Sequence, residues 1–217
     1  MFIMLMGVEI LALGLINIAQ LHGGLEPEQA NWFGRLLAWI VMTLCAHTVA
    51  RWSAGLPWWP WPAGLLARTG RCASRWVLVG IGLAVVFYLA LIASRMGLAP
   101  AERADLSARM ADFRGQFDSL SMGPLLALII VYHLLAPVFE EITFRSILFA
   151  HLNARFGFAI SSAISSVAFG LVHRSNFALM SVFGLGSCWL LQRSGRLAPS
   201  IALHASYNAM VTADASF

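Results

Sequence analysis

Long apolar segments constrain the fold of this chain more than any other feature of its sequence. Hydrophobic residues make up 59% of the 217 residues and charged residues only 11%, whereas a soluble domain carries about 25% charged residues. The mean hydropathy is +0.77. Because a spanning helix needs about 20 mostly apolar residues, this composition indicates an integral membrane protein.

About seven stretches are candidates for membrane helices by their length and apolar composition. They are approximately residues 1–20, 32–50, 75–94, 123–150, 157–173, 176–191 and 198–212. The last two are short for a complete span, as is typical of helices that are buried in a bundle or cross only part of the bilayer. We therefore predict an all-α fold: a polytopic transmembrane helical bundle with short or broken C-terminal helices.

The polar parts of the chain suit a membrane surface. Residues 99–120 carry mixed charges and predict a short helix lying at the interface. A tryptophan cluster broken by prolines, residues 57–62, suits the lipid headgroup layer. The fourteen basic residues are all arginines and are scattered along the chain, so we expect contacts with membrane lipid and no nucleic-acid partner.

A charged hexapeptide, EEITFR at residues 140–145, lies near the end of the fourth apolar segment and follows Phe139. Charges inside a membrane are costly, so these groups should face one another or a polar interior. In a helix, Glu141 and Arg145 are four residues apart and can form an ion pair. Glu140 lies about 100° around the helix and is less directly neutralised. Pro137 is expected to weaken or kink the helix and admit water, although a purely structural ion pair explains the hexapeptide equally well.

Two later apolar segments also carry polar side chains. His173 lies one helical turn after Phe169, while His204 and Asn208 are four residues apart and share a helix face. Each group taken alone is compatible with helix packing. Together with the carboxylates, however, they supply a base, a countercharge and hydrogen-bond donors, which is the set that peptide hydrolysis inside a membrane requires.

Three ordered motifs carry a resemblance to a known family. EExxxR occurs as EEITFR, FxxxH as FGLVH and HxxxN as HASYN, and in this order they resemble the CPBP family, the CAAX-processing and bacteriocin-processing intramembrane endopeptidases also called Abi proteins. The resemblance covers roughly residues 120–212. We expect one integral membrane domain over 1–217, with variable N-terminal helices and an interfacial loop in 1–120 and a catalytic core in 121–212.

The resemblance also implies roles for individual residues. Glu140 matches the general base, Glu141 and Arg145 complete its motif, and His173 matches the histidine of the second motif. His204 and Asn208 match the pair of the third motif and are suitable donors for an oxyanion. A carboxylate in a poorly solvated cavity is a stronger base than one in bulk water, which fits Glu140 as the group that activates water.

Whether a metal takes part stays open at this point. Two histidines and a carboxylate resemble a catalytic zinc set, and the candidate ligands would be Glu140, His173 and His204. HExxH is missing from the sequence, and the resemblance also allows a metal-independent glutamate mechanism. We favour the version without a cofactor and keep zinc as the alternative.

The sequence thus favours an intramembrane endopeptidase in a bacterial inner (cytoplasmic) membrane. Its expected substrate is a membrane-associated peptide or a protein C-terminal tail, such as a processing or sorting tail. One alternative is a noncatalytic membrane protein, for self-immunity or partner binding. A proton-coupled transporter is less favoured, because the sequence shows no internal repeat.

Small residues in the C-terminal segments predict close helix packing. They are Ser161, Ser162, Ser165, Ser166, Gly170, Gly184 and Gly186. A serine nucleophile is the less favoured explanation, since no GxSx pattern accompanies a histidine motif. The three cysteines are far apart in sequence and are expected to be buried free thiols.

Overall fold

The structure is a computed structural model that describes residues 41, 72–118, 122, 126, 129–173 and 176–215. The chain divides into two compact units, Met1–Trp61 and Pro62–Phe217, and the helices named below all belong to the second. Apart from Val41, the predicted segments 1–20 and 32–50 and the tryptophan cluster lie outside the described residues. The single-domain organisation therefore stays a prediction.

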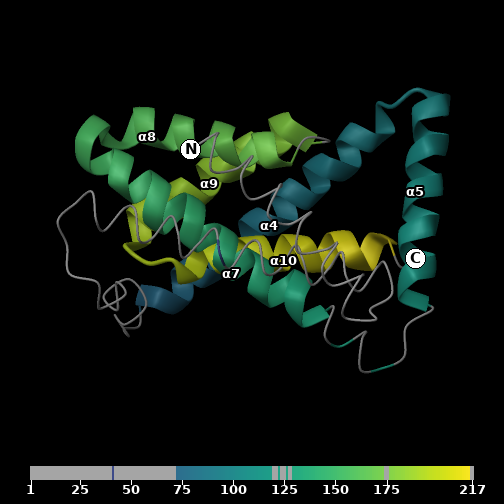
Figure 1. Cartoon of the computed structure of the whole chain (residues 1–217), viewed down its shortest axis with the longest axis horizontal. Coiled ribbons are helices and arrows are strands. Elements are labelled where there is room, and N and C mark those ends of the chain that lie inside the picture. The colour runs from purple at the N-terminus through teal and green to yellow at the C-terminus, as the bar shows by residue number, and fades with distance from the viewer. Residues whose placement is uncertain are drawn as a thin grey trace. The chain divides into compact units, whose positions relative to one another are not determined.

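The described residues of the second unit form helices and contain no strand (Figure 1). The α-helices are α4 (Cys72–Met96), α5 (Pro100–Asp118), α7 (Ala136–Glu141), α8 (Ala150–Val172), α9 (Phe177–Ser194) and α10 (Ala198–Ala215). Two π-helical segments, η1 (Val131–Leu135) and η2 (Ile142–Phe149), flank α7. This confirms the all-α prediction for the described part, including the polar helix expected near residues 99–120.

Two described helical segments are long and apolar enough to cross a membrane: Ser74–Met96 and Val131–Val172. The helices α9 and α10 have 18 residues each, as short as the sequence predicts. The larger set of about seven membrane segments is not established by these residues. On α4, Leu78 and Val86 are exposed large apolar side chains, which suits a surface that faces lipid.

The segment Val131–Val172 is not one straight rod but folds back on itself at Gly157. The backbone there has φ 73° and ψ 174°, values that only glycine adopts readily. Side-chain contacts then pair the two arms in antiparallel order: Phe149 with Phe158 and Phe144 with Phe169. The sequence predicts that one helix ends and the next begins between residues 150 and 157. The reversal lies at the last of these residues, because Gly157 can adopt the required backbone conformation.

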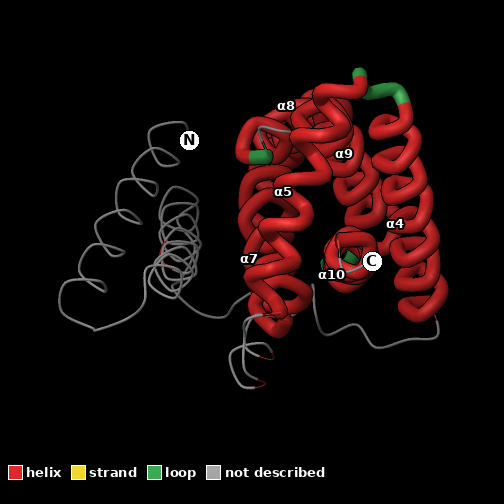
Figure 2. Tube along the Cα trace, turned by 90° about the vertical axis from the view of Figure 1, so that its right-hand side faces the viewer, coloured by secondary structure: helices red, strands yellow, loops and turns green. Residues whose placement is uncertain are grey.

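Helix α10 occupies the centre of this unit. It packs against α4, α9, η1 and α7, and Figure 2 shows it end-on between α4 and α7. Leu203 and His204 on α10 are almost completely buried. The helix consequently delivers the third motif into the same interior that receives the first two.

Helices α8 and α9 approach closely through small residues, as predicted. A Cβ atom added at Gly184 would lie 2.9 Å from the Cα atom of Ser166, closer than packed atoms allow. Gly170 likewise lies against the backbone of Phe177. The contact fixes α8 and α9 side by side, and α8 ends at the histidine of the second motif.

We predict that Gly184→Ala destabilises the folded protein by about 1–3 kcal/mol, because the added methyl group overpacks the α8–α9 contact. Gly82→Ala on α4 is the matched control, since nothing lies within 4 Å of a Cβ atom at that position. Alanine there should be neutral or slightly stabilising, because it is the better helix former. Thermal unfolding in detergent measures both variants, and equal stability would contradict the close-packing account.

Candidate active site

The two adjacent carboxylates lie on α7, a short α-helical piece between two π-helical segments. Both residues are buried, and Glu141 has no exposed surface. Pro137 is the second residue of α7 and has no N–H to donate to the preceding turn. The predicted disturbance by Pro137 therefore takes the form of π-helical turns in a continuous helix, a feature that is frequent at functional sites.

Glu141 lies between a guanidinium group and an imidazole. Arg145 Nε is 3.2 Å from Glu141 Oε2, and both side chains are completely buried, which confirms the predicted pairing across one helical turn. The contact is an ion pair without hydrogen-bond alignment. On its other side, the Nδ1 atom of His204 lies 3.2 Å from Glu141 Oε1. Both carboxylate oxygens of Glu141 thus have a partner side chain within the protein.

Glu140 faces two imidazole rings at a longer distance. Its Oε2 atom is 3.7 Å from His173 Nε2 and 3.8 Å from His204 Nε2, beyond the range of direct hydrogen bonds. This oxygen is buried and accepts no hydrogen bond from the described protein groups. The Nδ1 atom of His173 lies 2.8 Å from the Phe169 carbonyl oxygen; because a carbonyl only accepts, Nδ1 carries the proton and Nε2 is left facing Glu140.

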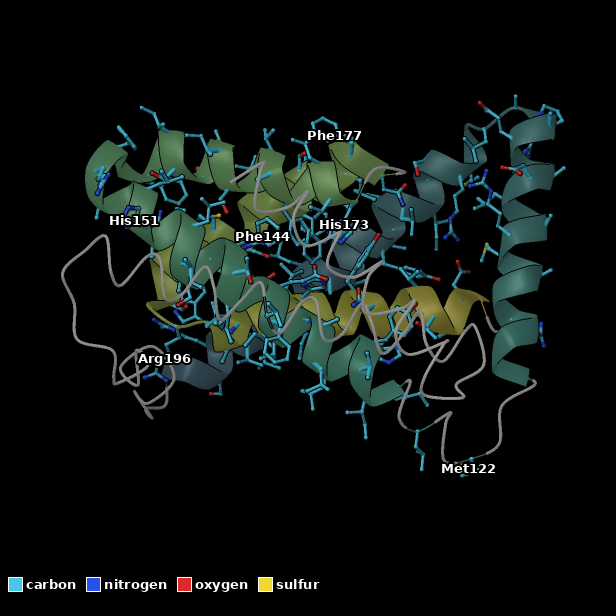
Figure 3. The ribbon with its side chains drawn as sticks, in the orientation of Figure 1. Met122, Phe144, His151, His173, Phe177 and Arg196 are labelled. Carbon is cyan, nitrogen blue, oxygen red and sulfur yellow. The ribbon has the colours of Figure 1, made fainter. Side chains whose placement is uncertain are left out.

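Phe169 is the aromatic centre around which these groups are packed. The guanidinium carbon of Arg145 lies 4.3 Å from the centre of its ring, a favourable cation–π distance. The rings of His173 and His204 contact it at centroid distances of 4.4 and 5.6 Å. In Figure 3, Phe144 and His173 lie near the middle of the view, among α8, α9 and α10.

The sequence alone does not single out Phe169 as a site residue. It carries a signal nonetheless, since Phe169 is the first residue of the FxxxH motif. A lone phenylalanine in an apolar helix, however, does not reveal which cation it will contact. Phe183, whose ring lies 5.3 Å from that of His204, carries no comparable signal in the sequence.

Asn208 lies one helical turn beyond His204 on α10, as the spacing predicts. Its Nδ2 atom donates a hydrogen bond of 3.0 Å to the backbone carbonyl of Tyr132 in η1. The structure therefore brings five of the expected site residues into direct contact or close approach, and places the sixth against the helix that precedes the carboxylates.

The fit to a metal ion is incomplete. Glu140, His173 and His204 have the donor atoms that zinc prefers. Across the described ranges, however, no group of three or more histidine, cysteine, aspartate or glutamate side chains is arranged to hold a metal ion.

We predict that Arg145→Ala destabilises the protein by about 3–5 kcal/mol, because it leaves the carboxylate of Glu141 buried and unpaired. Arg109→Ala is the matched control. Arg109 also pairs with a carboxylate four residues away, Asp105, but is 74% exposed, so its loss should change stability by no more than about 0.5 kcal/mol. Thermal unfolding in detergent compares the two variants. An equal loss of stability in both would show that the buried ion pair contributes no more than the exposed one.

Comparisons with known proteins agree with the motifs. Residues 122–210 match the family described as Type II CAAX prenyl endopeptidase Rce1-like. A protein of Bacillus subtilis (strain 168) named "Putative membrane peptidase YdiL" is 34% identical over 96 residues, which are 43% of this chain and 38% of that protein. The chain thus spans well under half the length of this relative. No solved structure matches this chain. Over residues 122–210, which hold all six expected site residues, these matches support the resemblance of the three motifs to the CPBP family of membrane proteases.

Proposed function

We propose that this membrane protein is an intramembrane endopeptidase in which Glu140 activates a water molecule for attack on a peptide bond. The observation that carries the proposal is the unequal environment of the two adjacent carboxylates. Glu141 is paired with Arg145 at 3.2 Å, whereas Glu140 Oε2 accepts no hydrogen bond from the described protein groups and faces two imidazoles. Glu140 is the carboxylate left free to act as a base.

The spacing around Glu140 supports a place for the attacking water. Its Oε2 atom lies 3.7 Å from Nε2 of His173 and 3.8 Å from Nε2 of His204. A bridging water molecule can span either separation. Such a water would give one proton to Glu140 while its oxygen attacks the carbonyl carbon. The buried surroundings favour this transfer, because few water molecules compete for the carboxylate.

Collapse of the tetrahedral intermediate breaks the C–N bond and requires a proton on the departing amine. Glu140 returns the proton that it took from the water, directly or through His173 Nε2. The second amide hydrogen of Asn208 is a proposed donor to the oxyanion, and so is Nε2 of His204 when both of its ring nitrogens carry a proton, because Nδ1 already faces the Glu141 carboxylate. Arg145 takes no part in the bond changes; it holds the charge of Glu141 beside them.

The proposed substrate is a membrane-associated peptide or a protein C-terminal tail, and the proposed location is a bacterial inner membrane. Two described helical segments are apolar enough to span a bilayer, which supports a membrane location for the protein that holds the buried carboxylates. A peptide bond that reaches Glu140 must therefore be carried by a segment that is stable at or in the membrane.

We expect Glu140→Gln to lower cleavage about 10²- to 10⁴-fold while the protein stays folded, because the amide cannot accept the proton of the water. Cleavage of a candidate peptide library by the purified protein in detergent, read by mass spectrometry, measures this. Glu102→Gln is the matched control, since Glu102 is an exposed carboxylate on α5.

Three results would overturn the proposal. Cleavage by the folded Glu140→Gln variant at the wild-type rate would remove Glu140 as the base. Folded Glu140→Gln and His173→Ala variants that keep their cellular phenotype would favour a noncatalytic partner-binding protein. Solute flux in sealed vesicles without any cleavage would favour the transporter.

Chelation tests the metal-free form of the proposal. We expect cleavage by the wild-type protein to be unchanged by a strong chelator, because the proposed base, proton carrier and oxyanion donors are all side chains. Loss of cleavage on chelation, with recovery when zinc is added back, would instead make Glu140, His173 and His204 metal ligands. Glu102→Gln, treated in the same way, controls for general effects of the chelator.

A further inference from the structure

The hydrogen bond from Asn208 to Tyr132 joins two helices at an unusual backbone position. The acceptor is the carbonyl oxygen of Tyr132, within the π-helical segment η1, and the donor is the Nδ2 atom of Asn208 at 3.0 Å. Side-chain amides seldom donate to carbonyls inside a helix, because those carbonyls already accept from the following turn. The local register of η1 explains why this one accepts from α10.

In η1 the backbone bonds connect residues five apart. The N–H of Ala136 donates to the carbonyl of Val131, which is the i to i+5 pattern of a π-helix. In the same register, the next carbonyl, that of Tyr132, would accept from residue 137. That residue is Pro137, which has no N–H. The donor that the helix cannot supply at this place comes instead from Asn208.

We propose that Asn208 is a positioning residue: its amide replaces the N–H missing at Pro137 and thereby holds the turn that carries Glu140. Pro137 precedes Glu140 by less than one helical turn. Helix α10 then holds the carboxylate-bearing helix at two points, through Asn208 to the Tyr132 carbonyl and through His204 to Glu141. The catalytic part of this inference rests on the proposed function.

This role differs from direct contact with the substrate. The Asn208 amide has two hydrogens, and the one given to Tyr132 is not available to an oxyanion. If Asn208 acts through its hydrogen bond to Tyr132, any change that gives the Tyr132 carbonyl a backbone donor should compensate for the loss of Asn208. If Asn208 acts only on the substrate, no change at residue 137 repairs its loss.

The test is a double-mutant cycle with Asn208→Ala, Pro137→Ala and both together. We expect Asn208→Ala to lower the Tm by about 3–8 °C, because it removes the hydrogen bond that the side-chain amide donates to the Tyr132 carbonyl. Pro137→Ala restores a backbone N–H at residue 137. The double variant should therefore lose clearly less than the sum of the two single changes, and this measurement needs no substrate.

Thr212→Ala is the matched control. Thr212 lies one turn beyond Asn208 on α10, and its hydroxyl lies 3.2 Å from His133 Nε2 in η1, so this contact joins the same two elements through a side chain of η1. The effects of Thr212→Ala and Pro137→Ala should add. Equal rescue of both α10 variants by Pro137→Ala would show only a general gain in stability and would overturn the proposal.

Catalysis gives the second readout, taken at temperatures where all variants are folded. Asn208→Ala should lower kcat about 100-fold through displacement of the base, with KM changed by less than about 3-fold. The double variant should recover at least about 10-fold of that kcat. No recovery in kcat, together with additive Tm changes, would leave Asn208 as a substrate-contacting donor only. If the wild-type cleavage does not depend on Glu140, the proposed function fails, while the Tm cycle still decides the role of Asn208.

Discussion

The buried ion pair between Glu141 and Arg145 is the interaction on which the rest of the candidate site depends. An arginine with no exposed surface is tolerated only where its charge is compensated, and here a carboxylate at 3.2 Å and the face of Phe169 at 4.3 Å share that task. Buried ion pairs contribute little net stability compared with well-packed apolar residues. The retention of this one is therefore explained better by the orientation it gives to neighbouring groups than by the free energy of unfolding.

That orientation separates two carboxylates that are adjacent in the sequence. Consecutive side chains on a helix point about 100° apart, so Glu141 meets Arg145 while Glu140 points towards the two imidazoles. His204 lies close to both, at 3.2 Å from Glu141 and 3.8 Å from Glu140. The three segments thus form one electrostatic unit. Because Glu141 contacts both Arg145 and His204, a substitution of Arg145 should also change the electrostatic environment of His204.

The sequence predicts the local part of this arrangement well. The pairing of Glu141 with Arg145 and the shared face of His204 and Asn208 follow from helical spacing, and the small residues of α8 and α9 indicate their close contact. Contacts between segments do not follow from spacing, because they depend on how the helices pack. The position of Phe169 over Arg145 and the π-helical register around Pro137 belong to this second class, and the first two predicted segments lie outside the described residues.

The reversal at Gly157 has a consequence for the length of the chain between the first two motifs. Gly157 stands almost midway between Glu140 and His173 in the sequence, so the two helical arms have nearly equal lengths and their far ends meet. One residue added to either arm would shift its end by about 1.5 Å and rotate it by about 100°. The interval between these motifs therefore fixes how the two arms meet: substitutions along the exposed sides of the arms are tolerated more readily than any insertion or deletion within them.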